Sequence, residues 1–372
     1  MTTGNPSKRK LIVAAILAFG VTPVLMAENA WRVWTGGDSV AGGDGIWTAD
    51  SLTWSARDDG AGTQYSQYRD KLKFPGGPAT IEVGERVEIE GTTHLLSEQL
   101  TFGGEGSIAV FNGLTLTAYP DTSTTFNCPI LMGEGKAIAI NMPNSGVDIP
   151  ATFRSAIVTI NSDLTISGRL TVYHGTLIMN GNVTVTASNC SIGSYSGNSG
   201  FYGRFQINGV QSGAAGYTVS PDSFMSGTGT VNNTANVNVY GCLQPGGFDT
   251  LGTLTLNSNW INFYDGAKLD FRVDLTADKA DKLVCGSTAK VQCKTVAGAA
   301  VAGATVRIHV SGKTSARRTY QLYEIVPQYK YCTFNYEIEK EPSCTAEVSF
   351  DEATGLLTVD PPKNAGLILF VR

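Results

Sequence analysis

Short triplets of apolar residue, threonine and apolar residue recur along the chain. They are Leu114-Thr115-Leu116, Val158-Thr159-Ile160, Leu164-Thr165-Ile166, Leu170-Thr171-Val172, Val183-Thr184-Val185, Leu254-Thr255-Leu256 and Leu357-Thr358-Val359. Alternation with a period of two places the apolar side chains on one face of a strand and Thr on the other. No stretch of a dozen residues after residue 27 keeps the i, i+3, i+4 apolar spacing of a helix. The pattern therefore predicts an all-β protein.

The triplets in the middle of the chain repeat with a period of 19 residues. Matching positions are Val158 and Leu177, Leu164 and Val183, and, as a weaker echo, Leu170 and residues 189–191. Three short strands in each 19-residue rung predict a parallel β-helix, because stacked rungs bury one continuous apolar column. An antiparallel sandwich with hairpins such as the one at 180–182 also fits these residues. We favour the parallel β-helix-like solenoid.

Composition divides the chain into four segments. These are a signal peptide (1–27), a Trp-rich amino-terminal β cap (28–104), a Thr/Asn/Gly-rich β-solenoid body (105–290) and an antiparallel β-sandwich-like unit (291–372). The sequence TIEVGERVEIEG, which begins at Thr80, alternates strictly and predicts an amphipathic strand pair. The last segment has longer and more charged strands, suited to cap the open end of a solenoid.

The first residues predict export. Lys8, Arg9 and Lys10 precede an apolar run at 11–25 that is too short to span a bilayer and ends near Ala27. We expect the mature protein to begin at Glu28 and to be extracellular, at the cell surface or in the periplasm. No later apolar stretch reaches the roughly 20 residues of a membrane span, so we expect none in the mature chain.

Charge and cysteine content limit the partners, disulfides and cofactors that we expect. The formal net charge of −5 becomes −8 once the three basic residues of the leader are removed, which argues against nucleic acid as a partner. Seven cysteines in an oxidising compartment predict disulfides. The pairs Cys285/Cys293 and Cys332/Cys344 have spacings that suit links between neighbouring strands. No metal-ligand spacing and no nucleotide-binding fingerprint occurs, so we predict no metal and no cofactor.

Several segments resemble a known family. They are MSGTGTV (225–231), QPGGFDTLGTLTL (244–256), GAKLDFRVD (266–274), ADKLVCGSTAKV (280–291) and the opening WTGGDSVAGGDGIWTADSLTW (34–54). Together they are similar to proteins with autotransporter-associated β-strand repeats, the passenger-like surface proteins of Gram-negative and related bacteria. The resemblance implies a secreted β-helical stalk for display, adhesion or glycan contact. Fewer than 90 residues follow Cys285, whereas a translocating barrel needs roughly 250, so we expect a passenger-like protein without that barrel.

Two aspartates are candidate catalytic acids. Asp121 begins Asp-Thr-Ser-Thr and Asp249 begins Asp-Thr-Leu-Gly, and aspartic proteases use two such turns to bring two carboxylates onto one water. Neither turn has glycine in the third position, and the Pro and Gly residues before Asp249 already predict a turn there. A catalytic pair and two turn aspartates remain alternative interpretations.

An acidic run offers a second kind of chemistry. It comprises Asp265, Asp270, Asp274, Asp278 and Asp281. Alternation places Asp270 and Asp274 on one face of a strand, and paired carboxylates along a groove are the groups used by polysaccharide hydrolases. A solvated surface accounts for the same residues.

Aromatic residues offer a binding interpretation, because sugars stack on aromatic rings. Trp34, Trp47 and Trp54 crowd the first mature segment, and Tyr195 and Tyr202 lie in a Gly/Ser/Tyr loop that interrupts the rungs. The alternative for the three tryptophans is an aromatic core. We expect a secreted or surface-exposed binding or adhesion protein that contacts glycans or glycoproteins. The alternative is a secreted hydrolase of glycoprotein material, either an aspartic-type protease or a β-helix polysaccharide hydrolase or lyase.

Overall fold

The computed structural model describes most of the chain after residue 30. The described residues are 31–36, 41–48, 53–55, 71–89, 92–110, 114–118, 122–132, 138–141, 156–186, 189–193, 202–294 and 303–362. The predicted signal peptide at 1–27 lies outside them. Over the described ranges, no helix has the length and apolar character needed to cross a membrane.

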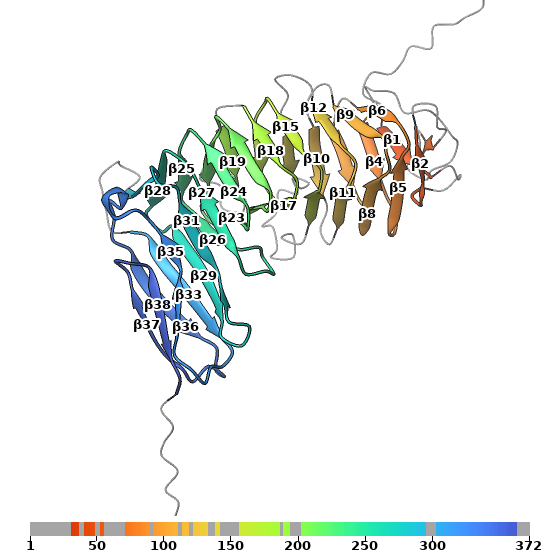
Figure 1. Ribbon diagram of the computed structural model, residues 1–372. Coiled ribbons are helices and arrows are strands. Elements are labelled where there is room, and N and C mark those ends of the chain that lie inside the picture. Colours follow the sequence, from red (N-terminus) through yellow and green to blue (C-terminus); the bar gives the residue numbers. More distant parts are fainter. Residues whose placement is uncertain are drawn as a thin grey trace, which may run out of the picture.

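The chain winds into a parallel β-helix. Along most of the chain, consecutive strands lie in different sheets, and a strand pairs in parallel with the strands one coil earlier and one coil later. Figure 1 shows the coils stacked in chain order into an elongated body, from the amino-terminal strands to the carboxyl-terminal strands. The predicted fold class, an all-β solenoid with a smaller antiparallel unit, is confirmed.

Two long sheets form two faces of the body. The twelve-stranded sheet contains, in spatial order, β3 (Trp54–Ser55), β1 (Trp31–Trp34), β4 (Lys71–Phe74), β7 (Thr92–Leu95), β10 (Leu114–Ala118), β13 (Ile138–Asn141), β16 (Leu170–Val172), β19 (Asn189–Ile192), β22 (Gly216–Val219), β25 (Val237–Val239), β28 (Trp260–Tyr264) and β32 (Lys290–Lys294). The thirteen-stranded sheet contains β2 (Gly45–Trp47), β5 (Ala79–Val83), β8 (Gln99–Gly103), β11 (Ser123–Phe126), β14 (Ile157–Ile160), β17 (Gly175–Met179), β20 (Gly203–Ile207), β23 (Phe224–Gly227), β26 (Cys242–Pro245), β29 (Lys268–Asp274), β33 (Thr305–Ser311) and β36 (Asn335–Lys340), with β30 (Lys279–Ala280) antiparallel to β29.

Two shorter sheets form the third face, and a small antiparallel sheet follows. The first of the two contains β6 (Arg86–Ile89), β9 (Ser107–Val110) and β12 (Ile130–Met132). The seven-stranded sheet contains β15 (Leu164–Ile166), β18 (Val183–Val185), β21 (Val210–Gly213), β24 (Thr230–Asn233), β27 (Thr253–Leu256), β31 (Lys282–Cys285) and β35 (Tyr323–Glu324). The antiparallel sheet contains β34 (Arg318–Gln321), β38 (Leu356–Asp360) and β37 (Glu347–Asp351), and a 3-10 turn, η3, spans Pro327–Tyr329.

The predicted 19-residue period is the register of the middle coils. Val158 on β14 pairs with Leu177 on β17, and Leu164 on β15 pairs with Val183 on β18. The weaker third match is also present, although Leu170 pairs with Cys190 after 20 residues rather than 19. The apolar column therefore sets the pairing, because a slip of one residue would turn the buried side chains outward.

The strict alternation at 79–89 belongs to two strands of one coil. β5 and β6 each expose every second side chain, as the pattern predicts. They do not pair with each other: β5 pairs with β2 and β8, whereas β6 pairs with β9. The two strands therefore meet at a corner between two faces and do not form the expected pair. Parallel pairing also continues across residues 104 and 290, where composition divides the chain.

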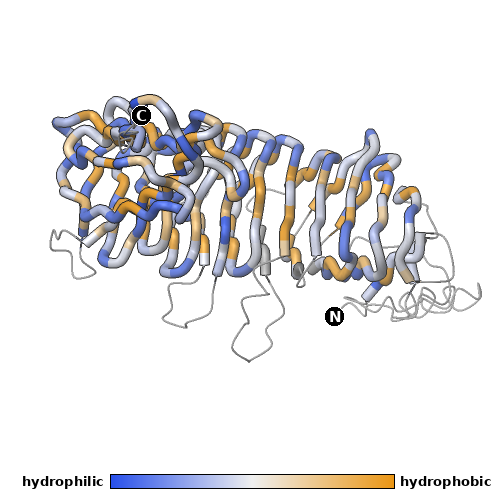
Figure 2. Tube along the Cα trace, turned by 90° about the horizontal axis from the view of Figure 1, so that it is seen from below, coloured by the Kyte–Doolittle hydropathy of each residue, from blue (hydrophilic) through white to orange (hydrophobic). Residues whose placement is uncertain are grey.

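The interior is a continuous apolar column. Leu177, Phe205, Met225, Leu243 and Leu269, in register on successive strands of one sheet, are each fully buried. Figure 2 shows apolar and polar residues alternating along the coils. Each such side chain contributes about 1.5–3 kcal/mol on burial, so the many short strands are stabilised by stacking.

A ladder of asparagine side chains holds one corner of the coils. The Nδ2 atoms of Asn161, Asn180 and Asn208 each donate to the Oδ1 atom of the asparagine one coil earlier, at 2.6, 2.6 and 2.7 Å. The first acceptor in the ladder is Asn127. Repetition of one amide at each turn satisfies donor and acceptor alike.

All seven cysteines are free thiols in the structure, and Cys332 alone among them is half-buried while the others are buried. The expected disulfides therefore remain a prediction.

Candidate functional site

The carboxyl-terminal strands of the thirteen-stranded sheet carry two polar rows on their outward face. Strand alternation sends Leu269, Phe271 and Val273 of β29 into the core, which leaves the residues between them outside. Parallel pairing then aligns Asp270, Arg307 and Glu337 in one row, and Arg272, His309 and Glu339 in the next. The rows cross β29, β33 and β36.

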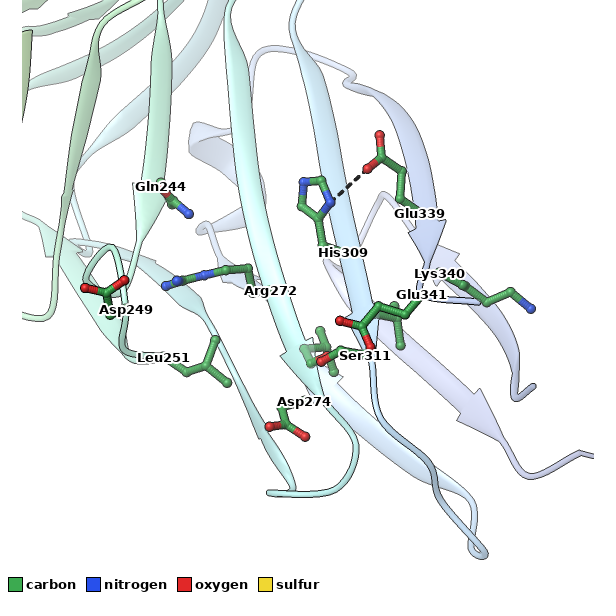
Figure 3. Close-up of a pocket in the computed structure, with 12 residues that line it drawn as sticks. Gln244, Asp249, Leu251, Arg272, Asp274, His309, Ser311, Glu339, Lys340 and Glu341 are labelled. Carbon is green, nitrogen blue, oxygen red and sulfur yellow. Dashed lines mark hydrogen bonds and ion pairs between the residues drawn. The ribbon is translucent and has the colours of Figure 1, made fainter. Parts of the chain in front are cut away.

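A hollow of about 580 Å³ lies over the carboxyl ends of these strands. We call it the charged groove. Its polar lining residues are Gln244, Asp249, Arg272, Asp274, His309, Ser311, Glu339, Lys340 and Glu341. Carboxylates and cations share this open surface (Figure 3), so the groove offers hydrogen-bonding partners to a hydroxyl-rich ligand.

The side chains of His309 and Glu339 are in contact in the groove. Nδ1 of His309 lies 2.9 Å from Oε2 of Glu339, and the imidazole side chain is 38% exposed. Figure 3 shows this contact between the neighbouring strands β33 and β36. Because Nδ1 is engaged by the carboxylate, the tautomer that leaves Nε2 as an acceptor is favoured when the ring is neutral. The arrangement can hold or move a proton at Nε2.

The loop at 246–250 is held by one buried ion pair. Arg272 donates from Nε to Asp281 Oδ2 at 2.8 Å, and the Asp281 side chain is fully buried. The same guanidinium donates to the backbone carbonyls of Phe248 at 2.7 Å and Thr250 at 2.8 Å. Burial raises the pKa of Asp281, and its hydrogen bonds with Arg272 act in the opposite direction. Arg272 therefore holds the loop in place, and its guanidinium is bound to Asp281 and to backbone carbonyls of the loop.

Asp249 lies exposed at a bend in this loop. Its neighbours on both sides have their carbonyls bound by Arg272, as expected for a turn. Asp249 also lines the charged groove. Its predicted catalytic partner, Asp121, lies outside the described residues, so the aspartic dyad stays a prediction.

A second hollow, of about 290 Å³, lies over the amino-terminal ends of the same strands. We call it the aromatic hollow. Its aromatic and charged lining residues are Tyr202, Asp222, Phe224, Tyr240, Asp265, Lys268 and Arg307. Tyr202 was among the binding residues predicted from sequence, and its ring is half-buried. The hollow combines aromatic rings with a few polar groups, as small-molecule binding sites do.

The polar side of the aromatic hollow is preorganised. Arg307 donates from Nε to Asp270 Oδ1 at 2.7 Å, and a second hydrogen bond joins Nη2 to Oδ2. This two-point contact fixes the plane of the guanidinium. The hydrogen bond with Asp270 also raises the pKa of Arg307, which favours the charged guanidinium.

The two hollows belong to one surface. Arg204 lies 4.9 Å from the ring centre of Phe224, in the aromatic hollow, and 4.9 Å from that of Phe248, in the loop beside the charged groove. Arg307 lines one hollow and His309 the other, two residues apart on β33 and about 7 Å along the strand. An extended ligand can therefore contact both hollows at once.

The three tryptophans predicted as binding residues lie in the core. The exposed fractions of Trp34, Trp47 and Trp54 are 1%, 3% and 0%. The rings pack together, with centres 5.2 Å apart for Trp34 and Trp54, and for Trp47 and Trp54. Phe74 joins this cluster. They form the aromatic core that was the alternative interpretation, and no ring face is left for a sugar. Tyr195 lies outside the described residues.

The aspartates of the acidic run make different contacts within the protein. Asp270 and Asp274 share the outward face of β29, as the alternation predicts. Asp270 binds Arg307, whereas Asp274 Oδ1 accepts backbone N–H groups of the following turn. Asp281 is buried against Arg272. Within the described parts of the chain, no cluster of three or more His, Cys, Asp and Glu residues is arranged to hold a metal ion.

Sequence reasoning missed Arg307, Lys268 and Tyr240. Arg307 and Lys268 occupy outward positions of long alternating strands, a signal present in the sequence. Their proximity to Tyr240 depends on the coil register, which the sequence at these positions does not reveal.

The fold and this surface define a parallel β-helix with an aromatic and charged outer face at its carboxyl-terminal end. No family model and no curated protein matches the sequence.

Proposed function

We propose that the protein is an exported binding or adhesion protein that contacts glycans or glycoproteins through the outward face of its thirteen-stranded sheet. The observation that carries the proposal is the aromatic hollow, in which Tyr202, Phe224 and Tyr240 lie beside the fixed Arg307–Asp270 pair. Sugar rings present apolar C–H faces to aromatic rings and hydroxyl groups to charged side chains. The hollow offers both within about 290 Å³.

Continuity with the charged groove favours an extended ligand. The joined surface runs along β29 and β33, which are seven residues long, or about 23 Å at 3.3 Å per residue. That length suits several linked sugar residues. The resemblance of segments 225–291 to autotransporter-associated repeats supports display outside the cell, and we propose the extracellular space, the cell surface or the periplasm as its location.

A glycan array followed by calorimetry tests this function. We expect the purified protein to be retained by a subset of glycans without releasing products. Tyr240→Ala should weaken that binding by up to about tenfold, because loss of one stacking contact costs about 0.5–1.5 kcal/mol. Tyr202→Ala should weaken it similarly.

Tyr331→Ala is the matched control, since Tyr331 is 54% exposed and does not line the aromatic hollow. Tyr240 stacks on Tyr264 with ring centres 4.0 Å apart, so each variant also needs a thermal unfolding curve. Wild-type affinity in a folded Tyr240→Ala variant would refute the site. Failure to bind any glycan would refute the function.

A polysaccharide hydrolase or lyase is the second candidate, favoured by the His309–Glu339 pair. Nε2 of His309 faces the charged groove with its orientation fixed by Glu339. Asp274 and Glu341 line the same groove, and carboxyl groups of this kind protonate or activate groups at a glycosidic bond.

Release of reducing ends or of unsaturated sugars from polysaccharides tests this candidate. His309→Asn should abolish release while leaving retention on glycans, whereas His94→Asn, on β7, should change neither. Product release that is equal in His309→Asn and the wild type would exclude His309 from catalysis. Asp249→Asn tests the predicted protease chemistry. Cleavage is measured in the same assay and with casein at acidic and neutral pH.

A further inference from the structure

Two cysteines 39 positions apart in the sequence meet at the carboxyl-terminal end of the solenoid. Cys293 lies in β32, and Cys332 follows η3. Val291 pairs with Lys330 in a parallel bridge, and the backbone N–H of Tyr331 donates to the Val291 carbonyl at 2.8 Å. Two residues further along both segments, Cys293 and Cys332 occupy matching positions.

The two thiols are in direct contact. Cys293 is buried in the core, and Cys332 packs against that core while remaining half-buried. The interaction of the two side chains lowers the pKa of Cys293 and raises the pKa of Cys332. Neighbouring strands lie about 4.8 Å apart, within the Cα separations of about 4.4–6.8 Å that disulfides span.

The segment that carries Cys332 is anchored on both sides. Nζ of Lys330 lies 2.6 Å from Oε1 of Glu352, and the backbone N–H of Phe334 donates to the same oxygen at 3.0 Å. The Lys330 and Glu352 side chains are only 11% and 17% exposed. Cys332 is therefore held facing Cys293.

We propose that Cys293 and Cys332 form a disulfide that joins the last coil of the twelve-stranded sheet to the segment that covers it. This pairing differs from the pairs Cys285/Cys293 and Cys332/Cys344 that spacing alone favours. It depends on the coil register and is independent of the proposed glycan binding.

A small disulfide such as oxidised glutathione supplies the oxidant. Once its proton has passed to the neighbouring Cys293 thiolate, the more exposed Cys332 attacks one glutathione sulfur, which breaks the glutathione S–S bond and releases one glutathione thiol. The Cys293 thiolate then attacks the Cys332 sulfur of the mixed disulfide and releases the second glutathione. Two electrons pass from the protein thiols to glutathione disulfide, and the two thiol protons end on the released glutathiones.

Mass spectrometry of the full protein tests the pairing. The protein is equilibrated with oxidised glutathione, alkylated under denaturing conditions and digested without reductant. We expect a peptide linked through Cys293 and Cys332. The oxidised protein should melt on the order of 5 °C above the reduced protein, because the bond closes a long loop.

Two variants complete the test. Cys332→Ser, at the half-buried position, should lose both the linked peptide and the difference in melting temperature. Cys344→Ser is the matched control and should retain both. Five other free cysteines remain alongside this pair. Alkylation of both Cys293 and Cys332 after oxidation would overturn the proposal, as would a linkage of either residue to a different cysteine.

Discussion

Arg272 binds the fully buried carboxylate of Asp281 across nine residues of sequence, with Nε at 2.8 Å from Oδ2. The carboxylate also accepts the backbone N–H groups of Gly252 at 3.1 Å and Arg272 at 3.0 Å. The pair thereby ties the loop at 246–250 to β29. The segment QPGGFDTLG takes its shape from this contact, and Asp249 is carried to its exposed end.

Replacing Arg272 should therefore destabilise the fold. Arg272→Met leaves a buried carboxylate without its cation, which costs about 3–5 kcal/mol, and it frees the loop that lines the charged groove. Urea unfolding measures the change. Lys282→Met is the control: Lys282 pairs with Glu324, whose side chain is 51% exposed, and surface pairs contribute about 0–1 kcal/mol. Equal losses in both variants would contradict this role of Arg272.

Gly246 should not tolerate a side chain. Its φ is 80°, and a Cβ atom there would overlap Asp281 Oδ1. Gly246→Ala should lower the free energy of unfolding by about 1–3 kcal/mol. At Gly77, a Cβ atom would meet nothing within 4 Å, so Gly77→Ala should be nearly neutral. Thermal unfolding compares the stability of the two variants. A Gly246→Ala variant as stable as the wild type would show that the loop adapts.

The asparagine ladder predicts a smaller loss. Asn161→Ala removes one hydrogen bond to Asn127 and one from Asn180, for a cost of about 1–2 kcal/mol. Asn335 is exposed on β36, and Asn335→Ala should change stability by less than about 0.5 kcal/mol. Chemical denaturation measures the free energy of unfolding of both variants. An unchanged Asn161→Ala variant would mean that the apolar column alone sets the coil spacing.

Stability should fall in mild acid partly because of His174. Burial lowers the pKa of His174 from its usual value of 6.5, so the folded state favours the neutral ring. The unfolded chain takes up a proton as the pH falls through 6.5, whereas the folded chain resists until its lower pKa. The contribution is complete above pH 6.5 and is lost progressively below it.

Denaturation curves at pH 7.5 and pH 5 measure this effect. His174→Gln should narrow the difference in unfolding free energy between the two pH values. His94, whose pKa is also lowered by burial and by Lys73 and Lys71, should keep part of that difference. Lys313→Gln, at an exposed position, should leave it unchanged. A difference in His174→Gln as large as in the wild type would exclude His174 as a source.

The sequence predicted the solenoid because stacking leaves a periodic trace. The pairs Val158–Leu177 and Leu164–Val183 are visible as repeats, since each coil must place an apolar residue at the same point of the column. The corner between β5 and β6 was misread as a strand pair. Alternation reports which face of a strand is buried, and it is the same whether the next strand pairs with it or turns away.

The candidate site was less predictable. Arg307 and Asp270 are 37 residues apart and meet because β29 and β33 pair in register. Neither residue type nor spacing carries that register. The tryptophans illustrate the opposite error. Trp34, Trp47 and Trp54 have the chemistry of a sugar site, but the same bulky rings fill the core of the first coils.

The position of the proposed binding face along the stack has a mechanical consequence. Six strand-to-strand steps separate β2 from β20, where that face begins, which amounts to about 29 Å at 4.8 Å per step. The earlier coils act as a rigid spacer. Deleting one whole coil would draw the face closer to the amino-terminal end by one step, without altering a single residue that lines it.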